Sequence, residues 1–264
     1  MAATQVGMRL VAESGHPYPD ANFRFIPSDK LASQNIPRST SLGLMAKHLD
    51  ITRINGQFHI EGYPDAVALK RIDTPVARQL QATTLHLSDL LFCETALEQL
   101  TQLESRHGVI PEALWVAAIA RFFKCFGNSE SRAQLSEKKI LKSHAGAHDV
   151  FGYFKNLRDK HLIHDESALT QGFTGVAVNA VGAQYQVADI IAMSFNAFTI
   201  DDAHLVQFRQ LVNVTLAWLR QKQEDLHNLL GAEYEKWARD DLLALPDITY
   251  TVPGSDAVST KREG

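Results

Sequence analysis

The sequence predicts a mainly α protein: an antiparallel helical bundle with small β-hairpin elements and an N-terminal extension. Apolar residues recur every three or four positions along four segments between residues 75 and 231, which is the spacing of a helix face. No proline interrupts the chain from Pro111 to Pro246. Four of the nine prolines lie instead within residues 1–37. Proline disrupts regular interior elements, so this first part is expected to be an arm rather than part of the bundle.

The composition is that of a soluble globular protein, with 264 residues, 45% of them hydrophobic and 21% charged. No run of about eighteen apolar residues is present, so no membrane span is expected. The first residues lack the basic flank and apolar core of a signal peptide. The two cysteines, Cys93 and Cys125, lie in apolar helical patterns and are expected to be buried thiols. A cytoplasmic location is therefore predicted.

The predicted N-terminal arm covers residues 1–72 and contains one β-hairpin. In the stretch from Ile51 to Glu61, the dipeptide Asn55-Gly56 separates two β-prone runs, as is typical of a tight hairpin turn. A helical domain is predicted over residues 73–250, and a flexible tail over residues 251–264.

Two helices are predicted at the start of the helical domain. The first begins at Pro75, with Thr74 as a possible cap, and runs toward His107. The second begins at Pro111 and ends at Gly127. Its apolar stripe consists of Trp115, Ile119, Phe122 and Phe126. The link between the two helices is short, which favours an antiparallel pair.

A hairpin and a long helix are predicted in the last third of the chain. Residues 173–181 and 185–198 are rich in β-prone residues and are split by Gly182, which favours a hairpin. A helix over residues 189–195 is the alternative. Thr199 to Asp202 resembles a capping box that opens a long helix ending near Gly231, and a short helix over residues 234–245 follows.

Chemically useful side chains concentrate between Asp149 and Glu166. Val150, Phe154 and Leu157 form an apolar helical stripe, and the same spacing then continues to two histidines, His161 and His164. Arg158 lies beside this change. One end of a core helix is therefore predicted to present a guanidinium and two imidazoles.

The segment from Arg158 to Asp165, with Asp159 directly after the arginine and His164 six positions on, resembles the Arg-(Asn/Asp)-x-x-x-x-His signature of HEPN helical domains. In that superfamily the arginine and histidine form the active site of many metal-independent ribonucleases, which often act as toxins or antiviral effectors. Many members are dimers with two motifs facing one another. The resemblance therefore implies an endoribonuclease, a homodimer, and RNA or a nucleotide as the partner, with no metal or cofactor.

Each residue of the motif has an expected role. Arginine carries a permanent charge in a planar fork that fits phosphate oxygens, so Arg158 is expected to stabilise charge on the phosphoryl group. Histidine transfers protons near neutral pH, and His164 is preferred to His161 because it has the family spacing. Asp159 and Asp165 are expected to orient this pair. The residues expected to hold neighbouring phosphates or substrate are Lys155, Asn156, Lys160 and His161.

Three alternatives remain open from the sequence. The polar end of the stripe can simply mark where the helix leaves the core. A HEPN-like module can also bind RNA, a nucleotide or a protein without catalysis. A metal site built from His144 and His148 with His161 and His164 is the third alternative, although Gly146 lies inside the first pair.

The net charge of −4 argues against a protein that coats nucleic acid by charge alone. The distribution is uneven, because residues 121–160 contain nine Lys and Arg against four Asp and Glu. If these cations share one surface, that surface is able to attract a polyanion. Otherwise the block is an ordinary solvated one.

Overall fold

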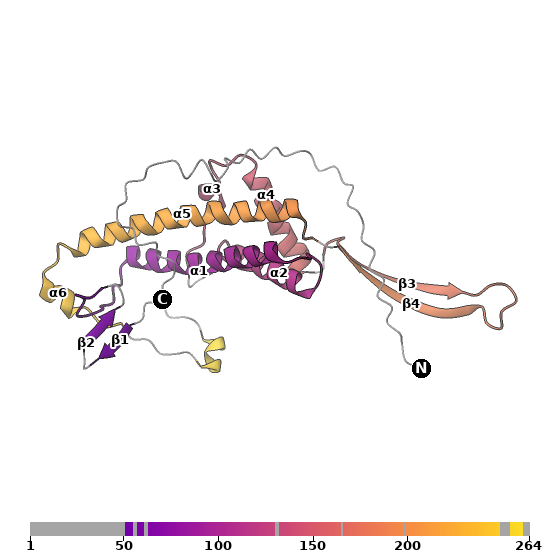
Figure 1. Ribbon diagram of the computed structural model, residues 1–264, viewed down its shortest axis with the longest axis horizontal. Coiled ribbons are helices and arrows are strands. Elements are labelled where there is room, and N and C mark those ends of the chain that lie inside the picture. Colours follow the sequence, from indigo (N-terminus) through magenta and orange to yellow (C-terminus); the bar gives the residue numbers. More distant parts are fainter. Residues whose placement is uncertain are drawn as a thin grey trace. The chain divides into compact units, whose positions relative to one another are not determined.

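The computed structural model describes residues 51–54, 57–60, 63–129, 132–164, 166–197, 199–248 and 254–260. The proline-rich part of the predicted N-terminal arm, residues 1–50, lies outside them. The elements in chain order (Figure 1) are β1 (Ile51–Ile54), β2 (Gln57–Ile60), α1 (Pro75–Gln102), α2 (Val109–Lys124), α3 (Glu137–Ile140), α4 (Ala147–Leu157), the π-helix η2 (Arg158–Ile163), β3 (Thr170–Val178), β4 (Val187–Asn196), α5 (Asp202–Tyr234), α6 (Arg239–Ala244) and the 3-10 helix η3 (Ser255–Ser259). The predicted mainly α fold is confirmed.

The contacts within the chain divide it into two compact units. Unit 1 contains Cys93–Phe123 and Leu141–Val212. Unit 2 contains, among the described residues, the segments before Cys93 and after Val212 together with Lys124–Ile140. The long helices α1 and α5 each contribute to both units. None of the described helices is long and apolar enough to cross a membrane.

Aromatic side chains form the core of unit 1. Trp115 of α2 packs edge-to-face against Phe154 of α4 and Phe208 of α5, with ring centroids 5.8 Å and 5.4 Å away. Phe122 lies 5.3 Å from the same Phe208 ring, also edge-on. Such pairs stabilise a fold by about 0.5–1.5 kcal/mol each beyond the area they bury. Trp115, Ile119 and Phe122 of the predicted stripe are buried, whereas Phe126 is half-buried and lies beyond the end of α2 at Lys124, three residues before the predicted Gly127. The helix begins two residues before Pro111, which lies in the first turn, where no backbone donor is needed.

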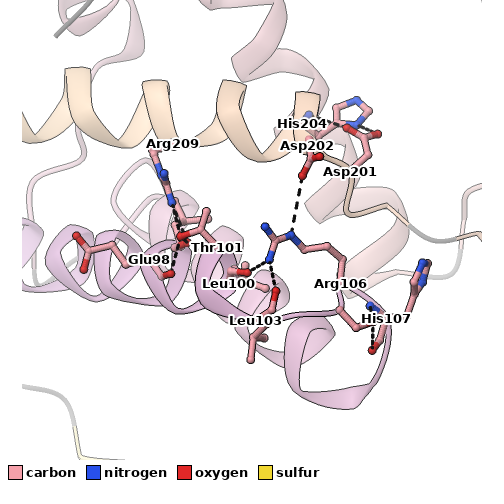
Figure 2. A network of polar contacts seen from close by, with 12 residues as sticks. Glu98, Leu100, Thr101, Leu103, Arg106, His107, Asp201, Asp202, His204 and Arg209 are labelled. Atoms are coloured by element: carbon pink, nitrogen blue, oxygen red, sulfur yellow. Dashed lines mark hydrogen bonds and ion pairs between the residues drawn. The ribbon is translucent and has the colours of Figure 1, made fainter. Parts of the chain in front are cut away.

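The two ends of α1 are held by side chains. At its start, the backbone N–H of Ala77 donates to Thr74 Oγ1 over 3.2 Å, so the predicted cap is confirmed. The helix ends at Gln102, short of the predicted His107. Arg106 explains the early end, because its Nη1 donates to the carbonyls of Leu100 and Leu103 (Figure 2). These are carbonyls of the last turn and the residue after it, which lack partners further along the helix.

The predicted start of α5 is wrong by two residues. The backbone N–H of His204 donates to Asp201 Oδ1 over 2.8 Å, so Asp201 caps the helix rather than Thr199. A carboxylate placed directly before the first turn both accepts this bond and complements the positive end of the helix. At the other end, α5 passes through Gly231 and stops at Tyr234. A single glycine costs a helix only about 1 kcal/mol, so it does not end one by itself.

Both predicted hairpins are confirmed. In β1–β2, Ile54 pairs with Gln57, and the predicted turn residues between them lie outside the described part of the chain. In β3–β4, Thr170 pairs with Asn196 at the base. The alternative helix over residues 189–195 is therefore wrong. Gly182 lies in the turn with φ of +95°, a conformation that glycine adopts without strain.

A buried ionic cluster marks unit 2. Asp89 of α1 is 5% exposed and accepts hydrogen bonds from Arg132 over 2.8 Å and from Lys124 over 3.3 Å. One turn earlier, His86 Nε2 lies 2.8 Å from the carbonyl oxygen of Ala133. These contacts join Lys124, Arg132 and Ala133 to α1.

The C-terminal elements are shorter than predicted. The helix expected over residues 234–245 forms only as α6, Arg239–Ala244. Within the predicted tail, residues 255–259 form the turn η3.

Candidate functional site

The helix that carries the predicted motif changes type where the motif begins. The chain passes directly from α4 into the π-helix η2 at Arg158, and it leaves η2 at His164, whose φ of −117° and ψ of 144° are extended. The predicted continuation of an α-helical stripe to both histidines is therefore wrong. A π-helix closes its hydrogen bonds over five residues instead of four, so its turn is wider and the register of side chains shifts.

The physical reason lies in what each segment can bury. Five residues of α4 are buried, the last of them Leu157, whereas none of η2 is buried. Past Leu157 no fully buried side chain of η2 holds the chain in α-helical register. Short π-helical turns are often found at functional sites, which makes this helix end the first place to look for a function.

Arg158 is held in one orientation. Its Nε donates to Asp159 Oδ1 over 2.6 Å, and its Nη2 pairs with the same oxygen. The guanidinium carbon also lies 5.1 Å from the centroid of the Phe123 ring, within cation–π distance. The Nη1 group makes no hydrogen bond to any residue that the structure describes. The Arg158 side chain is 24% exposed, so solvent reaches part of it.

The two histidines differ in their surroundings. His161 is half-buried, and its Nδ1 lies 3.2 Å from Ser167 Oγ. His164 is exposed. Within the described part of the chain, no hydrogen bond joins Arg158 to either of them. The structure thus brings Arg158 to Asp159 and His161 to Ser167, but it does not bring Arg158 into contact with His164.

The remaining predicted residues lie around this helix end. Lys155 and Asn156 are exposed on the last turn of α4, and Lys160 is exposed on η2. The carbonyl of Lys160 accepts a hydrogen bond from the backbone N–H of Glu166 over 2.9 Å, which folds the chain back after the motif. Asp165 lies outside the described residues.

One further imidazole of unit 1, that of His204, was not among the predicted site residues. His204 Nδ1 lies 2.6 Å from Asp201 Oδ2 (Figure 2), and the ring stacks on Tyr153 of α4 at 4.6 Å between centroids. A carboxylate that accepts a hydrogen bond from an imidazole fixes the orientation of the ring. The available signal was an acid three positions before a histidine at a helix start. The stacking with Tyr153 joins residues 51 positions apart and has no local signal.

The basic block predicted over residues 121–160 is divided. Lys124 and Arg132 are paired with the buried Asp89 of unit 2. The block's cations that belong to unit 1 are Arg121, Lys142, Lys155, Arg158 and Lys160. Only Lys155, Arg158 and Lys160 lie on α4 and η2, which together form the motif helix. The positive charge near the motif is therefore smaller than that of the whole block.

No cluster of metal ligands is found in the part of the chain that the structure describes, because no group of three or more His, Cys, Asp and Glu side chains there is placed to hold a metal ion. A hollow of about 600 Å³ lies in unit 2, and no predicted site residue lines it. Its lining residues are Lys236, Trp237, Ala238, Asp241, Ala244, Leu245 and Pro246.

The motif is the basis for any assignment of function. No protein-family model, no curated protein and no solved structure matches this chain.

Proposed function

We propose that this protein is a metal-independent endoribonuclease of HEPN type, acting in the cytoplasm as a toxin or defence effector. The observation that carries the proposal is the solvent-accessible π-helical end of α4, where an oriented arginine and an exposed histidine lie six positions apart. Both groups suit phosphoryl chemistry, and neither needs a metal ion.

The roles follow from the groups themselves. The 2′-hydroxyl of RNA loses its proton and attacks the adjacent phosphorus, while the departing 5′-oxygen gains a proton. His164 supplies one of these proton transfers. Arg158 stabilises the extra charge on the phosphoryl oxygens through its Nη1, because Nε and Nη2 are engaged by Asp159. The products are a 2′,3′-cyclic phosphate and a 5′-hydroxyl.

A second proton-transfer group is required at the same phosphate. A facing copy of the chain supplies one in a homodimer, since each copy brings its own His164. His161 is the alternative within one copy, although its Nδ1 is engaged with Ser167. Lys155, Asn156 and Lys160 are exposed on the same helix end and are suited to neighbouring phosphates.

A non-catalytic binding module is the second candidate, and one observation favours it. Asp159 pairs with Arg158 and cancels its charge, which weakens the attraction for a phosphate that is being cleaved. Such a site can still hold RNA, a nucleotide or a protein partner at moderate affinity.

Cleavage of single-stranded RNA in excess EDTA separates the two candidates. The expected result is cleavage that leaves 2′,3′-cyclic phosphate ends, reduced about 10²- to 10³-fold in His164→Ala and in Arg158→Ala. His227→Ala is the matched control, because His227 is exposed on the part of α5 in unit 2. Binding without cleavage supports the module, and activity abolished by EDTA contradicts a metal-independent enzyme.

A further inference from the structure

The hairpin formed by β3 and β4 extends away from the helices of unit 1 and is exposed on both faces. Figure 1 shows the two strands as a long arm, which is distinct from the N-terminal arm predicted over residues 1–72. Every residue of the strands is exposed or half-exposed. With nine and ten residues, the strands reach roughly 30 Å. A two-stranded hairpin alone is marginally stable in water, so an arm of this length is expected to gain stability from a partner.

The arm is also unusually apolar for an exposed element. Between Thr170 and Asn196, Asp189 is the single charged residue. Phe173 is 49% exposed, Ile191 44% and Met193 39%. Contiguous apolar surface of this kind on a soluble protein marks an interaction site.

Register divides the arm into two faces. Residues paired across the strands point to the same side, and the side alternates along each strand. Phe173 pairs with Met193, and Gly175 pairs with Ile191. The rings of Phe173 and Phe195 lie 5.6 Å apart, which places Phe195 on that side as well. We call this side, with Phe173, Ile191, Met193 and Phe195, the aromatic face.

The opposite side is more polar at its base. Gly172 pairs with Ser194, Thr174 with Ala192, and Val176 with Ile190. We call this side the aliphatic face. Aromatic residues and methionine are enriched at the cores of protein interfaces, whereas serine is depleted, so the aromatic face is the better docking surface.

We propose that the aromatic face is a dimerisation surface, and that its occupant is the aromatic face of a second copy of this chain. The arm offers no lysine or arginine to a nucleic acid or an anionic lipid surface, which leaves an uncharged apolar partner. A second arm has that character. Because the two faces are identical, a two-fold axis makes them self-complementary.

Charge and size decide the arrangement. When two arms stack in antiparallel directions, Asp189, on the aromatic face toward the tip, meets the base of the partner's arm instead of the same acid. A specific interface buries about 1,000 Å² or more in total, so the two faces are expected to meet along their full length. The inference does not depend on nuclease activity, because it uses none of the motif residues.

Two neighbouring isoleucines provide the test. Ile191 lies on the aromatic face and Ile190 on the aliphatic face, and both are largely exposed. Full-length protein, Ile191→Lys and Ile190→Lys are compared by sedimentation velocity at about 50 μM, well above the micromolar Kd of weak interfaces. The mass is expected to be twice the 29.3 kDa of the chain in the wild type and in Ile190→Lys, and to fall to 29.3 kDa in Ile191→Lys.

The other outcomes overturn the proposal. A monomeric wild type removes the second copy as the occupant. A dimer that persists in Ile191→Lys places the interface elsewhere, and a monomer with Ile190→Lys alone places it on the aliphatic face. Far-UV circular dichroism checks that each variant keeps the helical content of the wild type, so that loss of the dimer is not loss of the fold.

Discussion

Single buried residues of unit 2 have protonation states set by their surroundings. Burial by itself raises the pKa of Asp89, but the hydrogen bond from Arg132 and the charges of Lys124 and Arg132 outweigh it and hold that pKa below the usual value. The carboxylate is therefore ionised at neutral pH. Burial raises the pKa of the neighbouring Cys125 thiol to about 12, so this cysteine is not a nucleophile at neutral pH.

His86 is the acid-sensitive member of this cluster. Its Nε2 faces a carbonyl oxygen, which only accepts hydrogen bonds, so Nε2 carries the hydrogen. Its Nδ1 is buried without a hydrogen-bond partner in the described part of the chain. Burial is the main cause that lowers the pKa of His86, and the charge of Arg132 adds to it. The folded protein therefore holds the neutral imidazole.

This lowered pKa predicts a loss of stability in mild acid. Below pH of about 6.5 the unfolded chain binds a proton at His86 that the folded chain does not, so the free energy of unfolding decreases as pH falls toward the folded pKa. The slope contributed by one such group reaches at most about 1.4 kcal/mol per pH unit. Urea unfolding between pH 7.5 and 5.5 measures it. We expect a shallower decrease in His86→Gln than in the wild type.

The control for this experiment is His227→Gln, because His227 is exposed on α5. Its unfolding free energy should follow the wild-type pH dependence. The explanation fails if His86→Gln and the wild type lose stability in parallel, since the proton uptake would then belong to other groups.

At the scale of elements, two glycines test how far backbone conformation determines local stability. Gly152 lies within α4, and an added Cβ would meet nothing within 4 Å, so Gly152→Ala is expected to stabilise the protein by about 0.5–1 kcal/mol. Gly108, just before α2, has φ of +124°. Gly108→Ala forces an L-residue into that conformation and is expected to destabilise by about 1 kcal/mol or more.

Thermal unfolding of the two variants side by side measures this difference. Each variant is the control for the other, because both replace glycine with alanine and only the backbone conformation at the two positions differs. Melting temperatures that shift in the same direction for both variants would show that solvent exposure or packing, rather than backbone conformation, decides the effect.

The elements also show which features of the fold are predictable from sequence. The Thr74 cap and three residues of the α2 stripe, Trp115, Ile119 and Phe122, are local patterns, and these are confirmed. The early end of α1 depends on Arg106, which folds back onto carbonyls that a linear pattern does not reveal. The change to a π-helix at Arg158 depends on where packing against the core stops, so the periodicity that carried on to His161 and His164 was misleading.

The candidate site follows the same division. The sequence places Arg158 and Asp159 side by side, and their hydrogen bond follows from that adjacency. The partnership of His204 with Tyr153 joins two elements across unit 1 and therefore required the structure.

At the scale of the whole molecule, charge limits how RNA can bind. The net charge of −4 provides no general attraction for a polyanion, so any affinity has to come from a small local group of cations. At the proposed site these are Lys155, Arg158 and Lys160. The four cations of the block that belong to unit 2 include Lys124 and Arg132, both paired with Asp89.

The proposed function therefore predicts a weak dependence of RNA binding on salt. Three phosphate contacts to a single strand give a slope of about −2 in a plot of log binding constant against log salt concentration. Binding of single-stranded RNA to His164→Ala, which is expected to cleave it about 10²- to 10³-fold more slowly, measures this slope by fluorescence anisotropy. In that background, Lys155→Ala and Lys160→Ala should each reduce the magnitude of the slope by roughly 0.7.

Lys138→Ala provides the matched control, because Lys138 is an exposed lysine of the same basic block but lies on α3 in unit 2. It should leave the slope unchanged if contacts at the motif helix alone account for binding. A slope much steeper than −2, lowered equally by all three lysine variants, would mean that the whole basic block binds RNA. The motif would then not be the RNA-binding site, because its cations would contribute only to the positive potential of the whole basic block.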